Sequence, residues 1–298
     1  MKHLTLHNTE FIDYLEGFRR RMRDQGRKQS NCDGLANHVK EFFHFMEQND
    51  INSVKQITQK RVDDYFEYLS TRKNQRRGGI ISANFINKHR ESVLRFMEYY
   101  EGTGMGQSSI HIRYLKSDST ERVVLTEEEV AAMFNAQDNS LVGLSNKAIL
   151  ALLYGCGLRR SELYQLEVSD IDMARGVIRL ERTKTKFHRE VPMSSVVQHH
   201  LEQYLYNARE IMLPPGSSET HVLVTYRGRR MDIGTISYRT IKMSEDAGLD
   251  KVVRPHMLRH SIATHLLGEL TLEEVADLLG HRCLDSTQVY THLKQQIS

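Results

Sequence analysis

The first hundred residues of this chain contain four stripes of regularly spaced apolar residues, and this pattern predicts a helical domain. Apolar residues recur there every three or four positions, the spacing that places them on one face of a helix. We therefore predict a domain of four helices over residues 1–105, a length within the usual range for one domain. The stripes are Phe11, Leu15, Phe18 and Met22; Leu35, Val39, Phe42, Phe43 and Met46; Val62, Phe66 and Leu69; and Phe85, Ile86, Val93, Phe96 and Tyr100.

The periodicity stops at a stretch rich in glycine and serine. The sequence EGTGMGQSS covers residues 101–109, and the polar run KSDSTER covers 116–122. Such composition is typical of a flexible connection. We expect a linker over residues 106–122 and a second domain over 123–298.

The second domain has mixed character. Thr126 with Glu129, and Thr271 with Glu274, match the capping box that opens a helix. The run GVIRLERTKTKFHREVPM alternates apolar and polar residues on both sides of a polar centre, which predicts a β-hairpin, and THVLV predicts a further short strand. The expected fold class is therefore mainly α with a small β-sheet, divided into an N-terminal helical domain and an α+β domain.

The cysteines, the apolar runs and the N-terminal residues indicate where in the cell the protein is located. The three cysteines, Cys32, Cys156 and Cys283, are far apart and form no CxxC pair, so neither a disulfide framework nor a cysteine zinc site is expected. No apolar run approaches the ~18 residues that a membrane span needs. The N-terminal residues MKHLTLHNTEF contain no signal-peptide core. We expect a cytoplasmic protein without a membrane partner.

Basic runs indicate a polyanion as partner. The net charge is only +3, from 41 basic and 38 acidic residues, but residues 1–105 hold 18 basic against 14 acidic residues, a net of +4. Basic runs occur at 19–23, 72–77 and 227–230. Clusters of this kind contact the phosphates of nucleic acids. The candidate contact residues are Arg72, Lys73, Arg76, Arg77, Arg227, Arg229 and Arg230.

A helix that begins near residue 254 carries an unusual polar face. In RPHMLRHSIATHLL, residues 254–267, the side chains of His256, Arg259 and His260 stand at i, i+3 and i+4 and share one side of the helix. Three interpretations compete: a metal site, an anion site, or a chance cluster on a solvated surface. A zinc site is disfavoured because no Glu follows the first histidine and because Arg259 would repel a cation.

Three other segments add to this helix. GLRRSELYQL at 157–166 contains Arg159 and Glu162, RTKTKFHREVP at 182–192 places Lys184 near the tip of the hairpin, and LLGHRCLDSTQVYTH leads from Leu278 through His281 to Tyr290. Together the four segments resemble the tyrosine recombinase (phage integrase) family, especially its Xer-type members.

The resemblance is carried by motifs in a fixed order. The form G-L-R-x-S-E-L is matched by residues 157–163, and H-x-L-R-H-S/A-x-A-T-H by 256–265. L-L-G-H ends at His281, and S-T-x-x-Y-T-H is matched by 286–292. The resemblance is strong over about 123–292 and extends to the N-terminal helices only in type. It implies a helical, SAM-like core-binding domain followed by a tyrosine recombinase catalytic domain.

The resemblance assigns each motif residue a role. Tyr290 is the nucleophile that forms a 3′-phosphotyrosyl link, and Arg159 and Arg259 clamp the scissile phosphate. Lys184 protonates the departing 5′ oxygen, with Lys186 as the alternative two residues away. Three histidines and one carboxylate complete the set. His281 donates to the same phosphate, His256 positions or deprotonates groups at the attacking oxygen, and His260 supports the structure. Glu162 orients Arg159 or the strand of Arg159.

Elementary chemistry agrees with these roles. Two arginines neutralise the charge that develops on the phosphate oxygens. A phenol with a pKa of about 10 is a weak nucleophile at neutral pH, and a cationic pocket favours its phenolate. Because the positive charges are part of the chain, we expect no metal and no cofactor. The covalent intermediate retains the bond energy, so that rejoining needs no ATP.

We thus expect a site-specific DNA recombinase that acts as a homo-tetramer on paired duplex sites, in the nucleoid. A paralogous recombinase or an accessory protein is a candidate further partner. Two alternatives stay open: a type IB topoisomerase-like relaxing enzyme, and a DNA-binding protein without catalysis. The target sequence and the biological role, whether dimer resolution, integration and excision, inversion or transposition by a mobile element, do not follow from the sequence.

Overall fold

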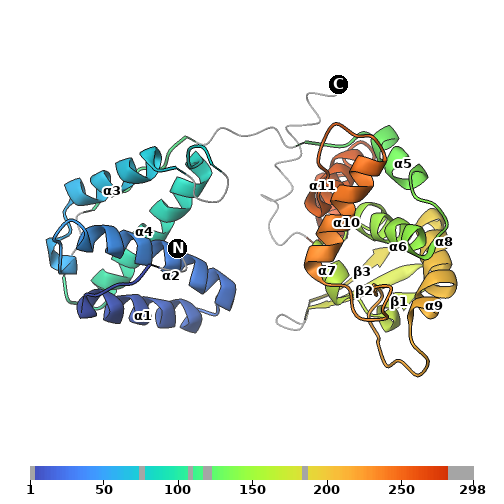
Figure 1. Cartoon of the computed structure of the whole chain (residues 1–298), viewed down its shortest axis with the longest axis horizontal. Helices are drawn as coiled ribbons and strands as arrows, with labels where there is room; N and C mark the ends of the chain where they lie inside the picture. The colour runs from blue at the N-terminus through green and yellow to red at the C-terminus, as the bar shows by residue number, and fades with distance from the viewer. Residues whose placement is uncertain (1–3, 74–77, 107–109, 117–122, 183–186, 281–298) are drawn as a thin grey trace. The chain divides into compact units, whose positions relative to one another are not determined.

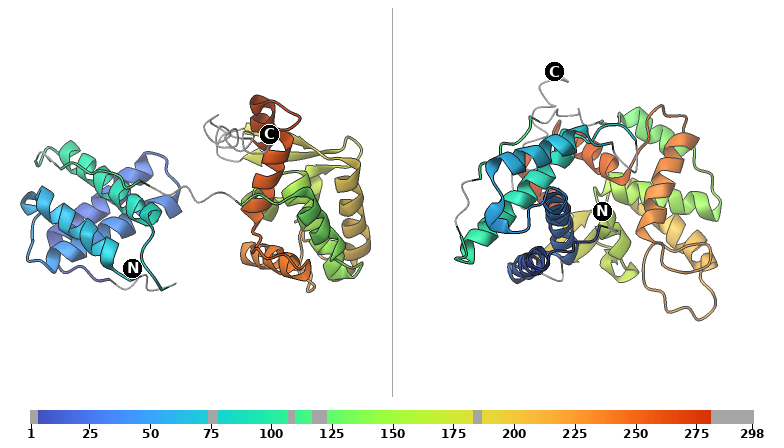
Figure 2. Two further views of the ribbon diagram at one scale, coloured as in Figure 1. Left: turned by 90° about the horizontal axis from the view of Figure 1, so that it is seen from above. Right: turned by 60° about the vertical axis from the view of Figure 1, so that its left-hand side comes forward.

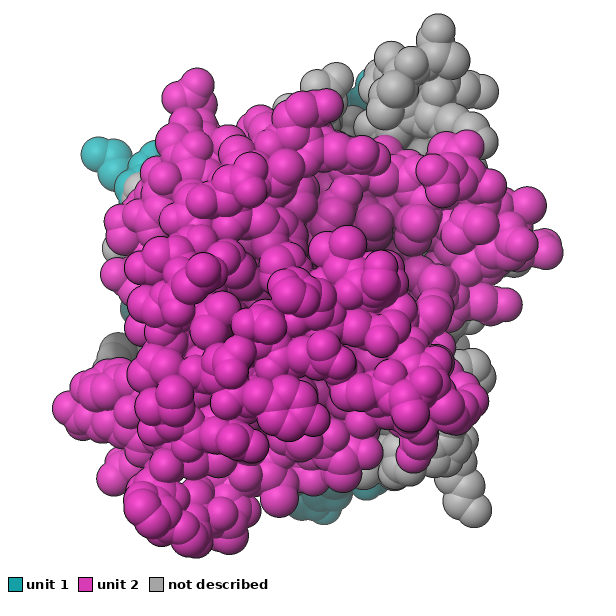
Figure 3. Space-filling model, turned by 90° about the vertical axis from the view of Figure 1, so that its right-hand side faces the viewer, with its two compact units in different colours: residues 1–120 teal, residues 121–298 magenta. Residues whose placement is uncertain are grey.

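The computed structural model divides the chain into two compact units, residues 1–120 and 121–298, coloured separately in Figure 3. The residues that the structure describes are 4–73, 78–106, 110–116, 123–182 and 187–280. Within them the chain is mainly helical with a small antiparallel sheet, as the sequence predicts (Figure 1). In the same residues, no helix combines the length and the hydropathy needed to cross a bilayer.

The described part of unit 1 contains four α-helices. They are α1 (Thr9–Asp24), α2 (Gln29–Glu47), α3 (Gln59–Thr71) and α4 (Ala83–Gly102), with a 3₁₀ turn, η1 (Val54–Gln56), before α3. The four predicted stripes form their shared core, in which the rings of Phe11 and Phe43 stack with their centroids 4.5 Å apart. Aromatic pairs of this kind add to the stability that area burial alone supplies.

A buried ion pair ties α2 to the end of α3. Glu41 of α2 is 4% exposed, and its Oε1 lies 2.7 Å from Nη1 of Arg72, the residue that ends α3. Burial raises the pKa of the Glu41 carboxyl, and the charge of Arg72 acts in the opposite direction. Arg72 therefore has a structural partner inside unit 1, whereas its neighbour Lys73 is exposed.

The first part of the predicted linker is bound to unit 1. The side chain of Gln59 accepts from the backbone N–H of His111 at 2.7 Å and donates to the His111 carbonyl at 3.1 Å. Asn87 does the same with Leu115, at 2.8 and 2.9 Å. Each side-chain amide thus makes the two backbone hydrogen bonds that a neighbouring strand would make. We call these contacts of Gln59 and Asn87 the two amide clamps, and they hold residues 110–115 against the helices of unit 1.

Unit 2 surrounds its core with helices and one small sheet. In the described residues its helices are α5 (Glu127–Asn135), α6 (Leu141–Leu150), α7 (Arg160–Gln165), α8 (Ser195–Tyr204), α9 (Glu210–Met212), α10 (Ile233–Asp246), α11 (Pro255–Leu266) and α12 (Leu272–Leu279). Two π-helical segments, η2 (Ala151–Gly155) and η4 (Leu205–Arg209), continue α6 and α8, and a 3₁₀ turn, η3 (Val168–Asp170), precedes the sheet. Both predicted capping boxes are confirmed, at α5 and α12.

The predicted hairpin is confirmed. β1 (Ile171–Asp172), β2 (Val177–Arg182) and β3 (Phe187–Pro192) form an antiparallel sheet in that order, and β2 and β3 pair Ile178 with Val191 and Leu180 with Arg189. Figure 2 shows the sheet to one side of the helices rather than between them. Because side chains alternate across a strand, Val191 and Arg189 lie on the same face of β3.

The strand predicted at THVLV does not form. Residues 220–224 make only isolated bridges, between Glu167 and His221 and between Val224 and Arg230. The hydroxyl of Tyr204 in α8 takes part of their backbone hydrogen bonding, donating to the Val222 carbonyl at 3.0 Å and accepting from the Val224 N–H at 3.1 Å. A side chain that occupies these positions interrupts the ladder that a strand requires.

We predict that replacing Arg72 with alanine destabilises unit 1 in a pH-dependent way. Loss of one partner leaves the Glu41 charge buried and uncompensated, which costs about 3 kcal/mol at pH 7. Removing Arg72 also raises the folded-state pKa of Glu41 further above its unfolded value. A carboxyl whose pKa is raised in the folded state contributes stability that is fully present below the unfolded pKa and is lost as the pH rises through the folded pKa. The loss of stability in Arg72→Ala relative to the parent should therefore be smaller at about pH 4.5 than at pH 7.

Urea titration of the full chain, followed by far-ultraviolet circular dichroism, measures this effect. Arg61→Ala is the matched control, because the Arg61–Asp64 pair lies 3.4 Å apart on the partly exposed surface of α3 and should contribute below about 1 kcal/mol. The double variant Glu41→Gln, Arg72→Ala should recover part of the loss. An Arg72→Ala deficit that is the same at both pH values would contradict the explanation.

Candidate active site

A glycine turn places the first predicted arginine. After η2 the chain reverses at Gly157, whose φ of +57° favours glycine, and a Cβ there would stand 2.5 Å from Cδ2 of Leu279. The turn is fixed by a hydrogen bond from the N–H of Leu158 to the carbonyl of Leu152, 3.0 Å long. Arg159 follows directly and forms the N-cap of α7.

Arg159 is oriented by Glu162 and by the end of α12. Its backbone N–H donates to Oε2 of Glu162 at 2.8 Å, and its Nη1 donates to Oε1 at 2.7 Å. Its Nη2 donates to the carbonyl of Gly280 at 2.9 Å. These contacts agree with the predicted orienting role of Glu162 and fix both ends of the guanidinium plane.

Arg259 is held in place by two backbone carbonyls. It lies on α11 and is buried, and it donates from Nη1 to the carbonyl of Gly157 and from Nη2 to that of Leu279, the latter at 2.6 Å. Its Nη1 also lies 3.8 Å from Oε2 of Glu162. The glycine turn and the end of α12 therefore meet at this side chain.

The sequence reasoning missed a third arginine in this cluster. Arg189 of β3 donates from Nη1 to the carbonyl of Leu278 at 3.0 Å and from Nη2 to Oε2 of Glu162 at 2.9 Å. Its side chain is only 9% exposed. The signal was present in the hairpin: Arg189 alternates in phase with the buried Val191, and a charged residue on the core face needs a partner.

Glu162 is the shared counter-ion of this arginine cluster. Burial alone would raise its pKa, but the charges of Arg189 and Arg159 and the hydrogen bond from the Arg159 backbone lower the pKa below its ordinary value. The carboxyl is therefore ionised at neutral pH. In the described part of the chain it lies within 4 Å of Arg159, Arg189 and Arg259, so that three positive charges face this one negative charge.

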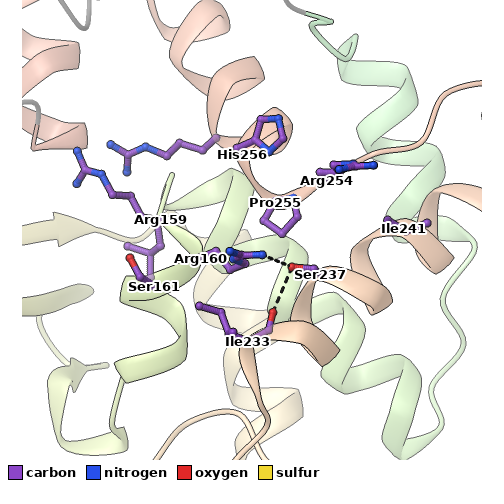
Figure 4. Close-up of a pocket in the computed structure, with 11 residues that line it drawn as sticks. Arg159, Arg160, Ser161, Ile233, Ser237, Ile241, Arg254, Pro255 and His256 are labelled. Carbon is purple, nitrogen blue, oxygen red and sulfur yellow. Dashed lines mark hydrogen bonds between the residues drawn. The ribbon is translucent and has the colours of Figure 1, made fainter. Parts of the chain in front are cut away.

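A cavity of about 410 Å³ opens beside the cluster (Figure 4). Its basic side chains come from the first residues of two helices: Arg159 and Arg160 from the start of α7, and Arg254, His256 and Arg259 from the start of α11. None of the described residues that line it is acidic. The remaining lining residues are Leu158, Ser161, Ile233, Ser237, Ile241 and Pro255.

One hydrogen bond secures the wall of this pocket. Nη1 of Arg160 donates to Oγ of Ser237 at 2.6 Å, and Ser237 donates to the carbonyl of Ile233 at 3.2 Å (Figure 4). This contact joins the start of α7 to the first turn of α10. The pocket is thus built on α7, α10 and α11 and on the residues directly before α7 and α11, and helices hold side chains in one geometry better than loops do.

The structure brings Arg159, His256 and Arg259 together at this pocket. His256 is exposed there, whereas His260, one turn further along α11, is buried and does not line the pocket, consistent with a supporting position. The other predicted catalytic residues, Lys184, His281 and Tyr290, lie outside the described residues, although Gly280, the residue before His281, belongs to the cluster.

The predicted DNA contacts other than Arg72 and Lys73 divide into three groups. Arg230 is engaged internally: it donates to the carbonyl of Tyr164 at 2.7 Å from Nη2, and its guanidinium carbon lies 3.6 Å from the centre of the Tyr164 ring. Arg227 and Arg229 are exposed on the same turn. Arg76 and Arg77 fall outside the described residues.

The chain is similar to known proteins over most of its length. The model of the phage integrase family matches residues 123–296. Tyrosine recombinase XerC of Oceanobacillus iheyensis is 31% identical over 296 residues, which cover 98% of this chain and 93% of the relative. Tyrosine recombinase XerD of the same organism is 34% identical over 216 residues, covering 71% and 72%.

Similar solved structures share the fold. XerH site-specific recombinase bound to a palindromic difH substrate has a TM-score of 0.72 and 18% identity, covering 98% of this chain and 89% of that one. The Tn1549 transposon integrase in complex with a circular intermediate DNA has a TM-score of 0.73 and 18% identity, covering 93% and 94%. The family match spans more than half of the sequence, and the chain belongs to the phage integrase family, as a site-specific DNA recombinase of the Xer tyrosine type.

Proposed function

We propose that this recombinase holds the scissile phosphate of duplex DNA in the cationic pocket and cuts the strand through a 3′-phosphotyrosyl intermediate. The observation that carries the proposal is the convergence of Arg159, His256 and Arg259 on one pocket whose described lining contains no carboxylate. The positive charges of Arg159 and Arg259 repel each other, Glu162 offsets part of that repulsion, and a bound phosphate would offset more of it.

The two arginines suit a phosphodiester. Arg159 spends two of its five side-chain N–H donors on Glu162 and Gly280, and the remaining donors are available to non-bridging oxygens. Guanidinium groups held in place by carbonyls need no reorganisation when charge develops on those oxygens. Arg159 and Arg259 would therefore stabilise the transition state more than they bind the ground state.

The start of α11 supports the same assignment. Arg254 is its N-cap without a side-chain capping bond, and His256 lies in the first turn. The first N–H groups of a helix lack intrahelical partners and carry partial positive charge. His256 would thus act at the attacking oxygen in a setting that already favours an anion.

The reaction itself needs Tyr290, Lys184 and His281. The Tyr290 hydroxyl gives its proton to His256 and its oxygen attacks phosphorus, the bond from phosphorus to the 5′ oxygen breaks, and Lys184 gives the leaving oxygen its proton. His281 donates to a non-bridging oxygen. In the reverse step the free 5′ hydroxyl gives its proton to Lys184 and attacks the phosphotyrosine, the bond from phosphorus to the Tyr290 oxygen breaks, and His256 returns the proton to Tyr290, so that the strand is rejoined without an external energy source.

The two units would share the DNA. We assign residues 1–105 to a core-binding domain and 123–298 to catalysis, with duplex DNA as the partner of both and exposed Lys73, Arg227 and Arg229 among the phosphate contacts. A homo-tetramer on two sites is the assembly that a strand exchange requires, and the cytoplasmic nucleoid is the proposed location. Phosphate contacts make such binding weaken steeply with salt.

A DNA ligand for the experiments can be selected by the protein itself. A duplex library with randomised sequence is bound by the Tyr290→Phe variant, and the retained fraction is amplified over several rounds. The selected sequence is then made as a duplex with a nick close to the cut position, so that a short fragment is lost and the covalent product accumulates. Each experiment below uses this nicked duplex.

We predict that Tyr290→Phe abolishes covalent attachment to this duplex while its affinity stays within about threefold of the parent's, because only the nucleophilic oxygen is removed. Denaturing gels report the covalent product, and fluorescence anisotropy reports binding. Tyr226→Phe and Tyr238→Phe are matched controls, since both tyrosines are 66% exposed. A covalent band that persists in Tyr290→Phe and disappears in a control would move the nucleophile.

We predict that Lys184→Ala slows cleavage by roughly the 10²–10⁴-fold that a general acid contributes. A strand with sulfur in place of the bridging 5′ oxygen should restore the rate of this variant, because a thiolate leaves without a proton. Arg259→Ala should not recover, since its charge acts on non-bridging oxygens. Rescue of Lys186→Ala in place of Lys184→Ala would assign the proton to the other lysine.

We also predict that cleavage of the nicked duplex proceeds unchanged in excess EDTA, because Arg159, Arg259 and the histidines supply the positive charge that a metal would otherwise provide. Single-turnover rates before and after dialysis against the chelator measure this. Loss of cleavage that zinc or magnesium restores would instead favour a metal held by His256 and His260.

A further inference from the structure

Arg189 makes contacts that none of the assigned roles explains. We propose that it is a positioning residue for cleavage, which fixes the backbone corner at Gly280 and thereby the start of the segment that carries His281. The proposal rests on the proposed function and adds a residue to it. Because Arg189 is not among the residues that line the pocket, the proposal gives it a positioning role rather than a contact with the phosphate.

Three consecutive carbonyls at the end of α12 each accept a hydrogen bond from a different arginine. Arg189 binds the carbonyl of Leu278 at 3.0 Å, Arg259 that of Leu279 at 2.6 Å, and Arg159 that of Gly280 at 2.9 Å. The last carbonyls of a helix lack intrahelical partners, and its C-terminus attracts positive charge. The end of α12 is therefore held at every peptide from 278 to 280.

The contribution of Arg189 differs from that of the other two. Arg159 and Arg259 both face the pocket and would be drawn toward a bound phosphate. Arg189 stands outside the pocket and joins the Leu278 carbonyl to Glu162, whose other partners are the two phosphate-binding arginines. Arg189 can therefore keep the helix end in place while Arg159 and Arg259 engage the substrate.

Close packing at Gly280 supports this reading. Gly280 has φ +62°, and a Cβ built on it would stand 2.6 Å from Nη1 and 2.8 Å from Cδ of Arg189. The arginine side chain therefore packs directly against Gly280. A shorter side chain at 189 would remove both this packing and the hydrogen bond to Leu278.

The chemistry requires a guanidinium rather than any cation. One planar group donates from Nη1 to a carbonyl and from Nη2 to a carboxylate, an arrangement that the fork geometry of arginine satisfies. A lysine is a single point donor that can keep one of the two contacts but not their relative direction. Lysine should therefore preserve the charge and lose part of the positioning.

The test compares Arg189→Ala and Arg189→Lys with Arg175→Ala. Arg175 is the matched control: it pairs with Glu190, the neighbour of Arg189 on β3, through two contacts of 3.0 Å, but it is exposed and does not contact α12. Three quantities are measured for the full chain: the melting temperature, the affinity for the nicked duplex, and the single-turnover rate of covalent attachment at saturating DNA.

We expect Arg189→Ala to bind the duplex within about threefold of the parent and to cleave it about 10²-fold more slowly, the effect of misplacing a catalytic group by about 1 Å. Arg189→Lys should lie between, and Arg175→Ala should match the parent. Cleavage by Arg189→Ala at the parental rate would overturn the proposal. If the parent itself forms no covalent product, the proposed function fails instead.

A double-mutant cycle identifies the route of the effect. If Arg189 acts through the corner before His281, then Arg189→Ala should lower the cleavage rate less than about threefold in a His281→Ala background. The side chain that Arg189 positions is already absent in that background. A full 10²-fold loss in that background would show that Arg189 acts elsewhere and would overturn the assignment. Should Arg189→Ala fail to fold, the same cycle with Arg189→Lys decides the question.

Discussion

Arginine side chains hold the end of helix α12 in place, and the candidate active site of unit 2 is built around that helix end. Arg159, Arg189 and Arg259 come from α7, β3 and α11, and each donates to one carbonyl of the same helix terminus. The negative charge of Glu162 offsets the repulsion among the three guanidinium groups. One carboxylate thus permits a concentration of positive charge that a phosphate diester can use.

Much of this could be predicted from the sequence because it follows from short-range rules. The four stripes of unit 1, the capping boxes at Thr126 and Thr271, and the hairpin are local patterns, and the structure confirms them. The motifs also identified Arg159, His256 and Arg259, which meet at one pocket. Lys184, His281 and Tyr290 stay predictions that rest on the motifs.

What could not be predicted depends on contacts between distant segments. The THVLV run has the composition of a strand, but the Tyr204 hydroxyl, some twenty residues earlier, takes the hydrogen bonds that a ladder would need. Arg189 has no motif of its own, and its importance follows only from the approach of β3 to the end of α12. Local propensity is a weak guide wherever tertiary contacts compete for the same backbone groups.

The two amide clamps on residues 110–115 change how far the two units can separate. Gln59 and Asn87 bind the backbone of this segment to unit 1, so the stretch of chain from the last clamped residue, Leu115, to the first described residue of unit 2, Val123, is only eight residues long. Eight residues span at most about 28 Å when fully extended. Once one unit has bound a duplex, the other would search a small volume, at an effective concentration of the order of millimolar. By shortening the connection between the units, the clamps would thus strengthen binding without adding a single contact to DNA.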